Sequence, residues 1–171
     1  MNFNMIRKLE IKDAPLMLEA MSDDNVNHFM NIDGNKMKLD DCVRFIEKSK
    51  SDSINANFAI VDESDSWVGT ISLKSIDKTS MSAEYAIITA SSVHGKGYAK
   101  KATKEILKYA FNVLNLNRVY LNVSVENERA NAFYKKVGFI YEGCSRKSHY
   151  IKGKLTSLNW YSLLKEEYVN E

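Results

Sequence analysis

The chain has 171 residues, 44% of them hydrophobic, and a formal net charge of +2 at pH 7. This size suits one compact domain with a substantial core, so we expect a single domain over residues 1–171. The small net charge does not indicate a nucleic-acid or membrane-surface partner. Neither of the two cysteines lies in a C-x-x-C or Cys/His spacing, so we expect no disulfide framework and no metal site.

The sequence also indicates a location. No apolar run is long enough to cross a bilayer. The first residues, MNFNMIRKLEIKD, lack the continuous apolar region of a signal peptide. We therefore expect a cytoplasmic protein.

The first third of the chain predicts one strand and two helices. Residues 3–10 alternate as a strand does, and Asp13 can cap a first helix with three apolar residues on its buried side. These three residues are Met17, Leu18 and Met21. An irregular connection, residues 25–38, leads to a second helix that begins near Asp40.

The middle of the chain predicts three strands and a long helix. Residues 57–62 and 67–76 form an antiparallel pair around an acidic turn, and Ser82–Thr89 is the third strand. A glycine-containing loop then opens into a helix whose apolar residues recur at three- and four-residue steps. They are Ala99, Ala102, Ile106, Tyr109, Ala110 and Val113.

The last third predicts a strand at residues 118–125, a short helix at 128–137 that Gly138 stops, and a final hairpin of residues 140–150 and 155–164. This order favours an α/β (α+β) fold: one mixed, mostly antiparallel sheet of about seven strands with helices on both faces. A β-α-β unit lies at its centre.

The loop before the long helix is the first candidate site. A glycine loop that opens into a helix presents unpaired N–H groups and the positive end of the helix dipole, which suits an anion. The alternative is an ordinary solvated face, since lysines at 96, 100, 104 and 108 line one flank of the helix. The loop does not match the Walker A motif. It does not match the dinucleotide-binding fingerprint either, because Lys100 occupies the position of the third glycine.

Two blocks of sequence resemble one known superfamily. The segment His94-Gly95-Lys96-Gly97-Tyr98-Ala99 resembles the Q/R-x-x-G-x-G/A acyl-CoA signature of the GNAT N-acetyltransferases. Residues 127–130 (NERA), 133–134 (FY) and 138–139 (GF) are similar to its N-x-x-A...Y...GF segment. The end of the chain resembles the branch of ribosomal-protein N-terminal acetyltransferases, to which spermidine and amino-sugar acetyltransferases are related.

The resemblance implies acetyl-CoA as co-substrate and a primary amine as acceptor. The strand before the loop would pair with pantetheine, and the amides of residues 95–100 would take the pyrophosphate. This arrangement needs a splay between Ser82–Thr89 and the strand at 118–125. The implied CoA-binding residues are Ile87, Ile88, Thr89, His94, Gly95, Lys96, Gly97, Tyr98, Ala99, Lys100, Asn127 and Ala130.

The resemblance also implies two catalytic residues. Tyr134 matches a tyrosine near the CoA sulfur, where a phenol can donate a proton to the departing thiolate; the alternative is a core tyrosine. Glu84 is the candidate base, acting directly or through water, because Asn122 occupies the place of a glutamate found in some N-terminal acetyltransferases. The alternative for Glu84 is an exposed strand carboxylate.

The acceptor and the rival functions stay open at this point. A non-catalytic acyl-CoA-binding regulator would keep the loop and Asn127 but lack the proton donor, for which Tyr134 is the candidate. A homodimer is compatible with the sequence. His94 stands where glutamine or arginine is usual, and Ser157 where many members carry aspartate. Loss of that carboxylate ranks polyamines behind small amines or amino sugars and protein N-termini, unless acidic residues between Asp23 and Asp41 compensate.

Overall fold

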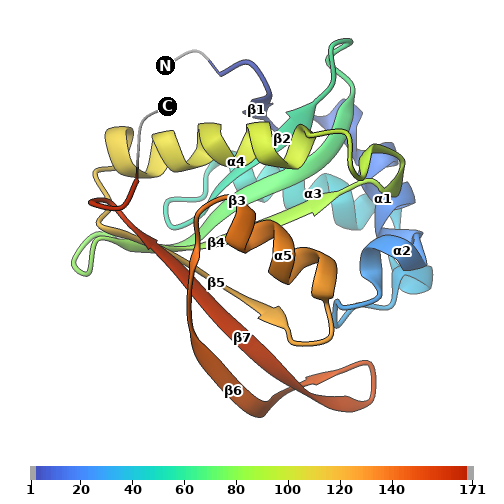
Figure 1. The fold of residues 1–171 in the computed structure, drawn as a ribbon. Coiled ribbons are helices and arrows are strands. Elements are labelled where there is room, and N and C mark those ends of the chain that lie inside the picture. The colour runs from blue at the N-terminus through green and yellow to red at the C-terminus, as the bar shows by residue number, and fades with distance from the viewer. Residues whose placement is uncertain (1–2, 169–171) are drawn as a thin grey trace.

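The computed structural model describes residues 3–168, and its seven strands form one sheet in the order β1-β2-β3-β4-β5-β7-β6 (Figure 1). The strands are β1 Ile6–Lys8, β2 Ala56–Val61, β3 Trp67–Asp77, β4 Ser82–Thr89, β5 Arg118–Ser124, β6 Ile140–Ile151 and β7 Lys154–Leu164. The α-helices are α1 Ala14–Ser22, α2 Asp24–Asn27, α3 Leu39–Lys50, α4 Tyr98–Lys108 and α5 Glu128–Lys136. Short 3-10 turns occupy Ile11–Asp13, Gly34–Lys36 and Ser91–Val93.

The sheet is mixed, as predicted. Among the described strands β4 and β5 are the parallel pair, and every other neighbouring pair is antiparallel. A parallel pair needs a crossover, and α4 supplies it between β4 and β5. The predicted seven-stranded, mostly antiparallel sheet is therefore confirmed.

Helices cover both faces of the sheet. A large core joins α4 and Phe139, the residue before β6, to β3, β4, β5 and β7, and it includes Ile71, Ile106 and Val119, each fully buried. Tyr134 of α5 belongs to the same core. A smaller core on the other face joins α1 and α3 to β2 and β3. Figure 1 shows α4 and α5 in front of the sheet and α3 behind it. No helix among residues 3–168 is long and apolar enough to cross a membrane.

Two sequence predictions about the first elements of the chain were wrong in detail. The first strand is shorter than residues 3–10, since β1 spans only Ile6–Lys8. Helix α1 buries Ala14, Met17 and Ala20, and Leu18 and Met21 are only half-buried. The reason is that the buried side of α1 is narrow and its residues are three positions apart. The residue that follows each of them in the sequence therefore lies at the edge of the buried side.

The predicted apolar stripe of the long helix holds only as far as Ala110. A π turn, Tyr109–Val113, follows α4, and the Leu114 amide donates to the Tyr109 carbonyl at 3.0 Å, five residues back. Such a turn rotates the following side chains relative to an α-helix. Phe111 is consequently fully buried and Val113 is 51% exposed, the reverse of the prediction for Val113.

A buried carboxylate ties β1 to the start of α1. Asp13 is 1% exposed, and its two oxygens accept hydrogen bonds from the Arg7 guanidinium at 2.8 and 2.9 Å. The Glu10 amide also donates to Asp13 at 2.8 Å. Arg7 further contacts Asp65, which is 53% exposed, at 2.6 Å. This network fixes the entry of the chain into the helical layer behind the sheet.

Candidate active site

A splay opens between β4 and β5. The two strands pair at Ser82, Ala83 and Glu84, opposite Arg118, Val119 and Tyr120. Beyond Glu84, β4 continues to pair with β3 as far as Thr89, and β5 pairs with β7 as far as Ser124. Over residues 85–89 the edge of β4 that faces β5 therefore has no strand partner among the described strands, and the predicted splay is confirmed.

The loop after β4 presents free backbone donors. Gly95 and Gly97 have φ of +78° and +88°, which favour glycine. Within residues 3–168 the amides of residues 95 and 97–100 have no hydrogen-bond partner. The Lys96 amide, in contrast, donates to the Val93 carbonyl at 3.1 Å, so it does not belong to the predicted row of free amides.

These donors fit a phosphate group. They gather at the N-terminus of α4, where the helix dipole adds positive potential. A side chain built on Gly95 or Gly97 would meet no atom within 4 Å, so the space beside these residues is open. The lysines at 96, 100 and 108 of the adjacent flank are exposed. The loop could therefore hold the pyrophosphate of a CoA molecule.

Asn127 caps α5 and keeps a donor. Its Oδ1 accepts the Ala130 amide at 3.1 Å, so the capping role expected for an asparagine before a helix is present. Its side-chain NH2 has no partner in the described part of the chain and can still donate to a ligand. Capping and ligand binding are compatible at this residue.

A residue that the sequence reasoning missed positions α5. Asn131, 9% exposed, donates through Nδ2 to the carbonyls of Ser124 at 2.9 Å and Asn127 at 2.8 Å. Its Oδ1 accepts from Asn159 at 2.9 Å and from the Tyr161 hydroxyl at 2.8 Å. Asn131 thereby joins α5 to β5 and β7 and sets the place of Tyr134, one turn later. Its position four residues after Asn127 was the available signal.

Tyr134 lies inside the core with a free hydroxyl. Its ring is 8% exposed and packs near Tyr85, Phe139 and Tyr161. Burial raises the pKa of Tyr134 to about 12. Its hydroxyl has no hydrogen-bond partner among residues 3–168, yet no described side-chain polar atom is both fully buried and unpaired. The oxygen therefore reaches accessible space, although the ring also serves the core.

Glu84 lies on the opposite face of the sheet. Successive strand residues point to opposite faces, and the neighbouring Tyr85 points to the face on which it contacts Tyr134. The Glu84 carboxylate accepts from Lys74 of β3 at 2.8 Å and is 25% exposed. Glu84 is the last β4 residue that pairs with β5, so it stands at the closed end of the splay. The structure thus places the two candidate catalytic residues on either side of the sheet.

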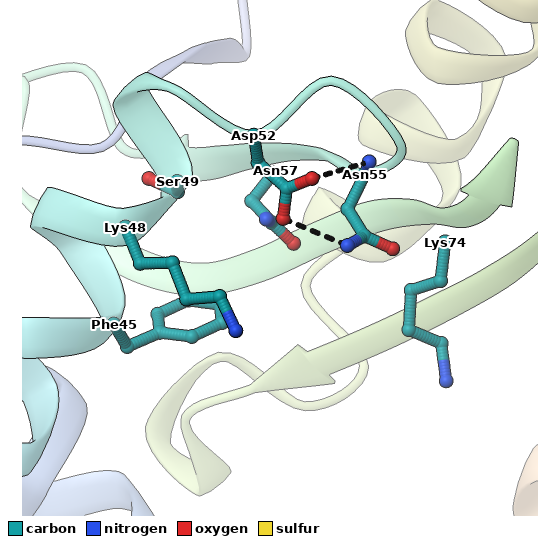
Figure 2. Close-up of a pocket in the computed structure, with 7 residues that line it drawn as sticks. All are labelled: Phe45, Lys48, Ser49, Asp52, Asn55, Asn57 and Lys74. Carbon is teal, nitrogen blue, oxygen red and sulfur yellow. Dashed lines mark hydrogen bonds between the residues drawn. The ribbon is translucent and has the colours of Figure 1, made fainter.

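A small pocket of about 180 Å³ lies beside Lys74, lined by Phe45, Lys48, Ser49, Asp52, Asn55, Asn57 and Lys74. Its carboxylate, Asp52, accepts from the Asn55 side chain at 2.7 Å and from the Asn55 amide at 3.0 Å. Hydrogen bonds from Asn55 lower the pKa of Asp52. Figure 2 shows the Lys74 amine pointing away from Asp52, in agreement with its pairing to Glu84. Asp52 therefore holds a turn and is not a candidate base.

A larger open pocket of about 680 Å³ lies on the final hairpin and is lined by Arg146, Lys147 and Ser157. The Ser157 hydroxyl accepts the Lys147 amide at 2.9 Å. The Ser157 carbonyl accepts the Val125 amide at 3.1 Å, so the pocket adjoins the end of β5. Its two charged side chains are both cationic.

Comparisons with known proteins agree with this geometry. The family model described as acetyltransferase (GNAT) domain matches residues 5–140. The chain is 32% identical over 166 residues to "Uncharacterized N-acetyltransferase p20" of Bacillus licheniformis, covering 95% of this chain and 93% of that protein. It is 38% identical over 106 residues to "Putative ribosomal N-acetyltransferase YdaF" of Bacillus subtilis, covering 62% of this chain and 58% of that protein.

Solved structures point the same way. The crystal structure of spermidine N-acetyltransferase from Vibrio cholerae in complex with CoA and spermine superposes with a TM-score of 0.87 at 28% identity, over 96% of this chain and 97% of that chain. No group of three His, Cys, Asp or Glu that could hold a metal occurs within residues 3–168. The matches are to enzymes, which removes the non-catalytic regulator. The chain belongs to the GNAT acetyltransferase family and is an N-acetyltransferase that uses acetyl-CoA as its donor.

Proposed function

We propose that this enzyme transfers the acetyl group directly to a primary amine in a ternary complex, and that the acceptor is a small amine with an anionic group, such as an amino-sugar nucleotide. The observation that carries the choice of acceptor is the cationic pocket of Arg146, Lys147 and Ser157 beside the end of β5. An acceptor phosphate would be attracted to these two charges.

The donor side of the proposal rests on backbone groups. Acetyl-CoA, when bound, supplies an acetyl group activated as a thioester. The free amides of residues 95 and 97–100 would hold its pyrophosphate, and Asn127 would donate from its side-chain NH2. The unpaired edge of β4, at Ile87, Ile88 and Thr89, would hydrogen-bond pantetheine as it would an added strand.

The splay would bring the two catalytic residues to one reaction centre from opposite faces. Glu84 would accept the ammonium proton of the acceptor, directly or through water, so that the amine becomes nucleophilic. Tyr134 would donate to the departing thiolate from the α5 side. A pKa of about 12 keeps the phenol protonated at neutral pH, as a donor requires. Lys74 would hold the Glu84 carboxylate in place through their ion pair.

The acidic residues near α2 do not favour a polyamine. Two of them are already paired with cations: Asp33 with Lys36 and Asp41 with Arg44. Carboxylates held in this way contribute less free negative charge to a bound polycation. This supports the ranking of polyamines behind the other amines.

Two other acceptors have support from the comparisons. Similarity to the spermidine N-acetyltransferase of Vibrio cholerae favours a polyamine. Similarity to the protein named as a putative ribosomal N-acetyltransferase favours a protein N-terminus. A cytoplasmic location and a homodimer stay predictions.

The test compares kcat/KM for spermidine, an amino-sugar nucleotide and an alanine-terminated peptide, with thiol release as the signal. Replacing Arg146 and Lys147 together by glutamine should lower kcat/KM for the amino-sugar nucleotide by roughly tenfold or more. The kcat/KM for the alanine-terminated peptide should stay almost unchanged. Lys50→Gln, an exposed lysine on α3, is the control. Efficient spermidine acetylation, with no effect of the double substitution on the nucleotide, would overturn the proposed acceptor.

A further inference from the structure

An arginine of α5 reaches the loop that follows β4. Nη1 of Arg129 lies 2.5 Å from Nδ1 of His94, and Nη2 lies 3.5 Å from Nε2. The two residues are 35 positions apart, one in each of the two sequence blocks that define the CoA site. A guanidinium can only donate, so the imidazole nitrogen that faces it must accept. The ring is therefore neutral in this arrangement.

The surroundings of His94 agree with a neutral ring. Burial and the charge of Arg129 lower the pKa of His94, against the smaller opposing effects of the Thr89 backbone and Asp23. Asp23 is engaged by Asn25 and Ser91. These groups, from β4, from α5 and from the residue before α2, are the ones that act on the ring.

Arg129 carries an uncompensated charge. Its guanidinium makes no ion pair with a carboxylate among residues 3–168, and its partner in the structure is a neutral base. Surface arginines commonly pair with carboxylates. An arginine that donates to a neutral imidazole instead keeps its full positive charge, which can attract an anion. His94 immediately precedes Gly95, the first of the free amides. The charge is thus fixed to the loop that presents them.

We propose that Arg129 is a phosphate-binding residue for CoA and that His94 is its positioning residue, holding the guanidinium against the loop. The position of His94 is one at which glutamine or arginine is usual in the signature that the loop resembles. The structure suggests why histidine serves there: it accepts from Arg129, and α5 supplies the cation in place of the loop. This inference rests on the proposed placement of the CoA phosphates at residues 95–100.

The test measures the Kd of CoA by calorimetry, without turnover. Arg129→Gln should weaken CoA binding by roughly ten- to a hundredfold, the effect of one charge-assisted hydrogen bond. Lys136→Gln, an exposed lysine at the end of the same helix, should leave the Kd almost unchanged. Dephospho-CoA distinguishes the phosphates: an equal loss with both ligands assigns Arg129 to the pyrophosphate, and a loss with CoA alone assigns it to the 3′-phosphate.

Variants of His94 separate positioning from mere packing. His94→Gln keeps an acceptor for Arg129 and should retain CoA affinity, but His94→Leu should lose it. The double variant His94→Arg with Arg129→Gln returns a cation to the loop and should recover most of the affinity. If the Arg129→Gln variant binds CoA as the parent does, but the separate Gly97→Val variant does not bind it, the role of Arg129 is overturned and the loop site stands. If Gly97→Val also binds CoA normally, the proposed loop site falls as well.

Discussion

Removal of one oxygen from Tyr134 should separate catalysis from stability. The hydroxyl of Tyr134 has no hydrogen-bond partner in the described part of the chain, so Tyr134→Phe removes no protein hydrogen bond, and its ring contacts with Tyr85, Phe139 and Tyr161 persist. We expect the free energy of unfolding to change by less than about 0.5 kcal/mol. If the phenol donates to the departing thiolate, kcat should fall roughly ten- to a thousandfold, or about 1.4 to 4 kcal/mol in the barrier.

Tyr161 provides the matched control. Its hydroxyl donates to Asn131 at 2.8 Å and its side chain is 1% exposed, so Tyr161→Phe removes a buried hydrogen bond. That loss should cost about 1 kcal/mol of stability. Because Asn131 keeps its bonds to Ser124 and Asn127, α5 should stay in place, and kcat should fall far less than in Tyr134→Phe.

The assay combines urea unfolding, CoA titration and thiol release for both variants. Tyr134→Phe should bind CoA almost as the parent protein does, because the hydroxyl acts late in the reaction. The pKa of about 12 also means that ionisation of Tyr134 should give no falling limb in the parent pH–rate profile below about pH 10, the ordinary pKa of a phenol. Equal kcat for variant and parent would refute the role of Tyr134, and a loss of stability like that of Tyr161→Phe would refute the free hydroxyl.

Two further predictions concern the loop and the fold. Gly97→Val should raise the Kd of CoA at least about tenfold, because a β-branched residue at φ +88° strains the N-terminus of α4 and would obstruct the approach of a phosphate; normal binding by a folded variant would count against the site. Asp13→Asn should lower the free energy of unfolding by about 3 kcal/mol, since it leaves the charge of Arg7 without its buried partner. Urea unfolding checks this value, and Asp65→Asn, at a 53% exposed carboxylate, should have a much smaller effect.

The features that could be predicted from the sequence depend on local patterns. Alternation placed the strands, since β4 is Ser82–Thr89 as expected and the final hairpin turns at Lys152 and Gly153. The glycines predicted the loop before α4 and the end of α5, and in the structure Gly95, Gly97 and Gly138 all have positive φ. Near neighbours in the chain decide these properties, so a single sequence carries them. The resemblance to the GNAT superfamily rested on the same local blocks.

Features that join distant segments needed the tertiary structure. Periodicity did not reveal that α4 ends in a π turn, which buried Phe111 instead of Val113. No pattern paired Lys74 with Glu84, because their contact depends on the register of β3 against β4, and a shift of one residue would send either side chain to the other face.

The site itself shows the same division. The sequence determined that a loop with free amides precedes α4 and that a tyrosine follows Asn127 in α5. The resemblance predicted that β4 and β5 separate, and the tertiary structure located that separation after Glu84. The tertiary structure alone decided that Tyr134 and Glu84 lie on opposite faces and that Arg129 contacts His94. The physical reason is that each of these contacts depends on how the sheet register and helix packing bring together residues far apart in the chain, and no local pattern encodes that arrangement.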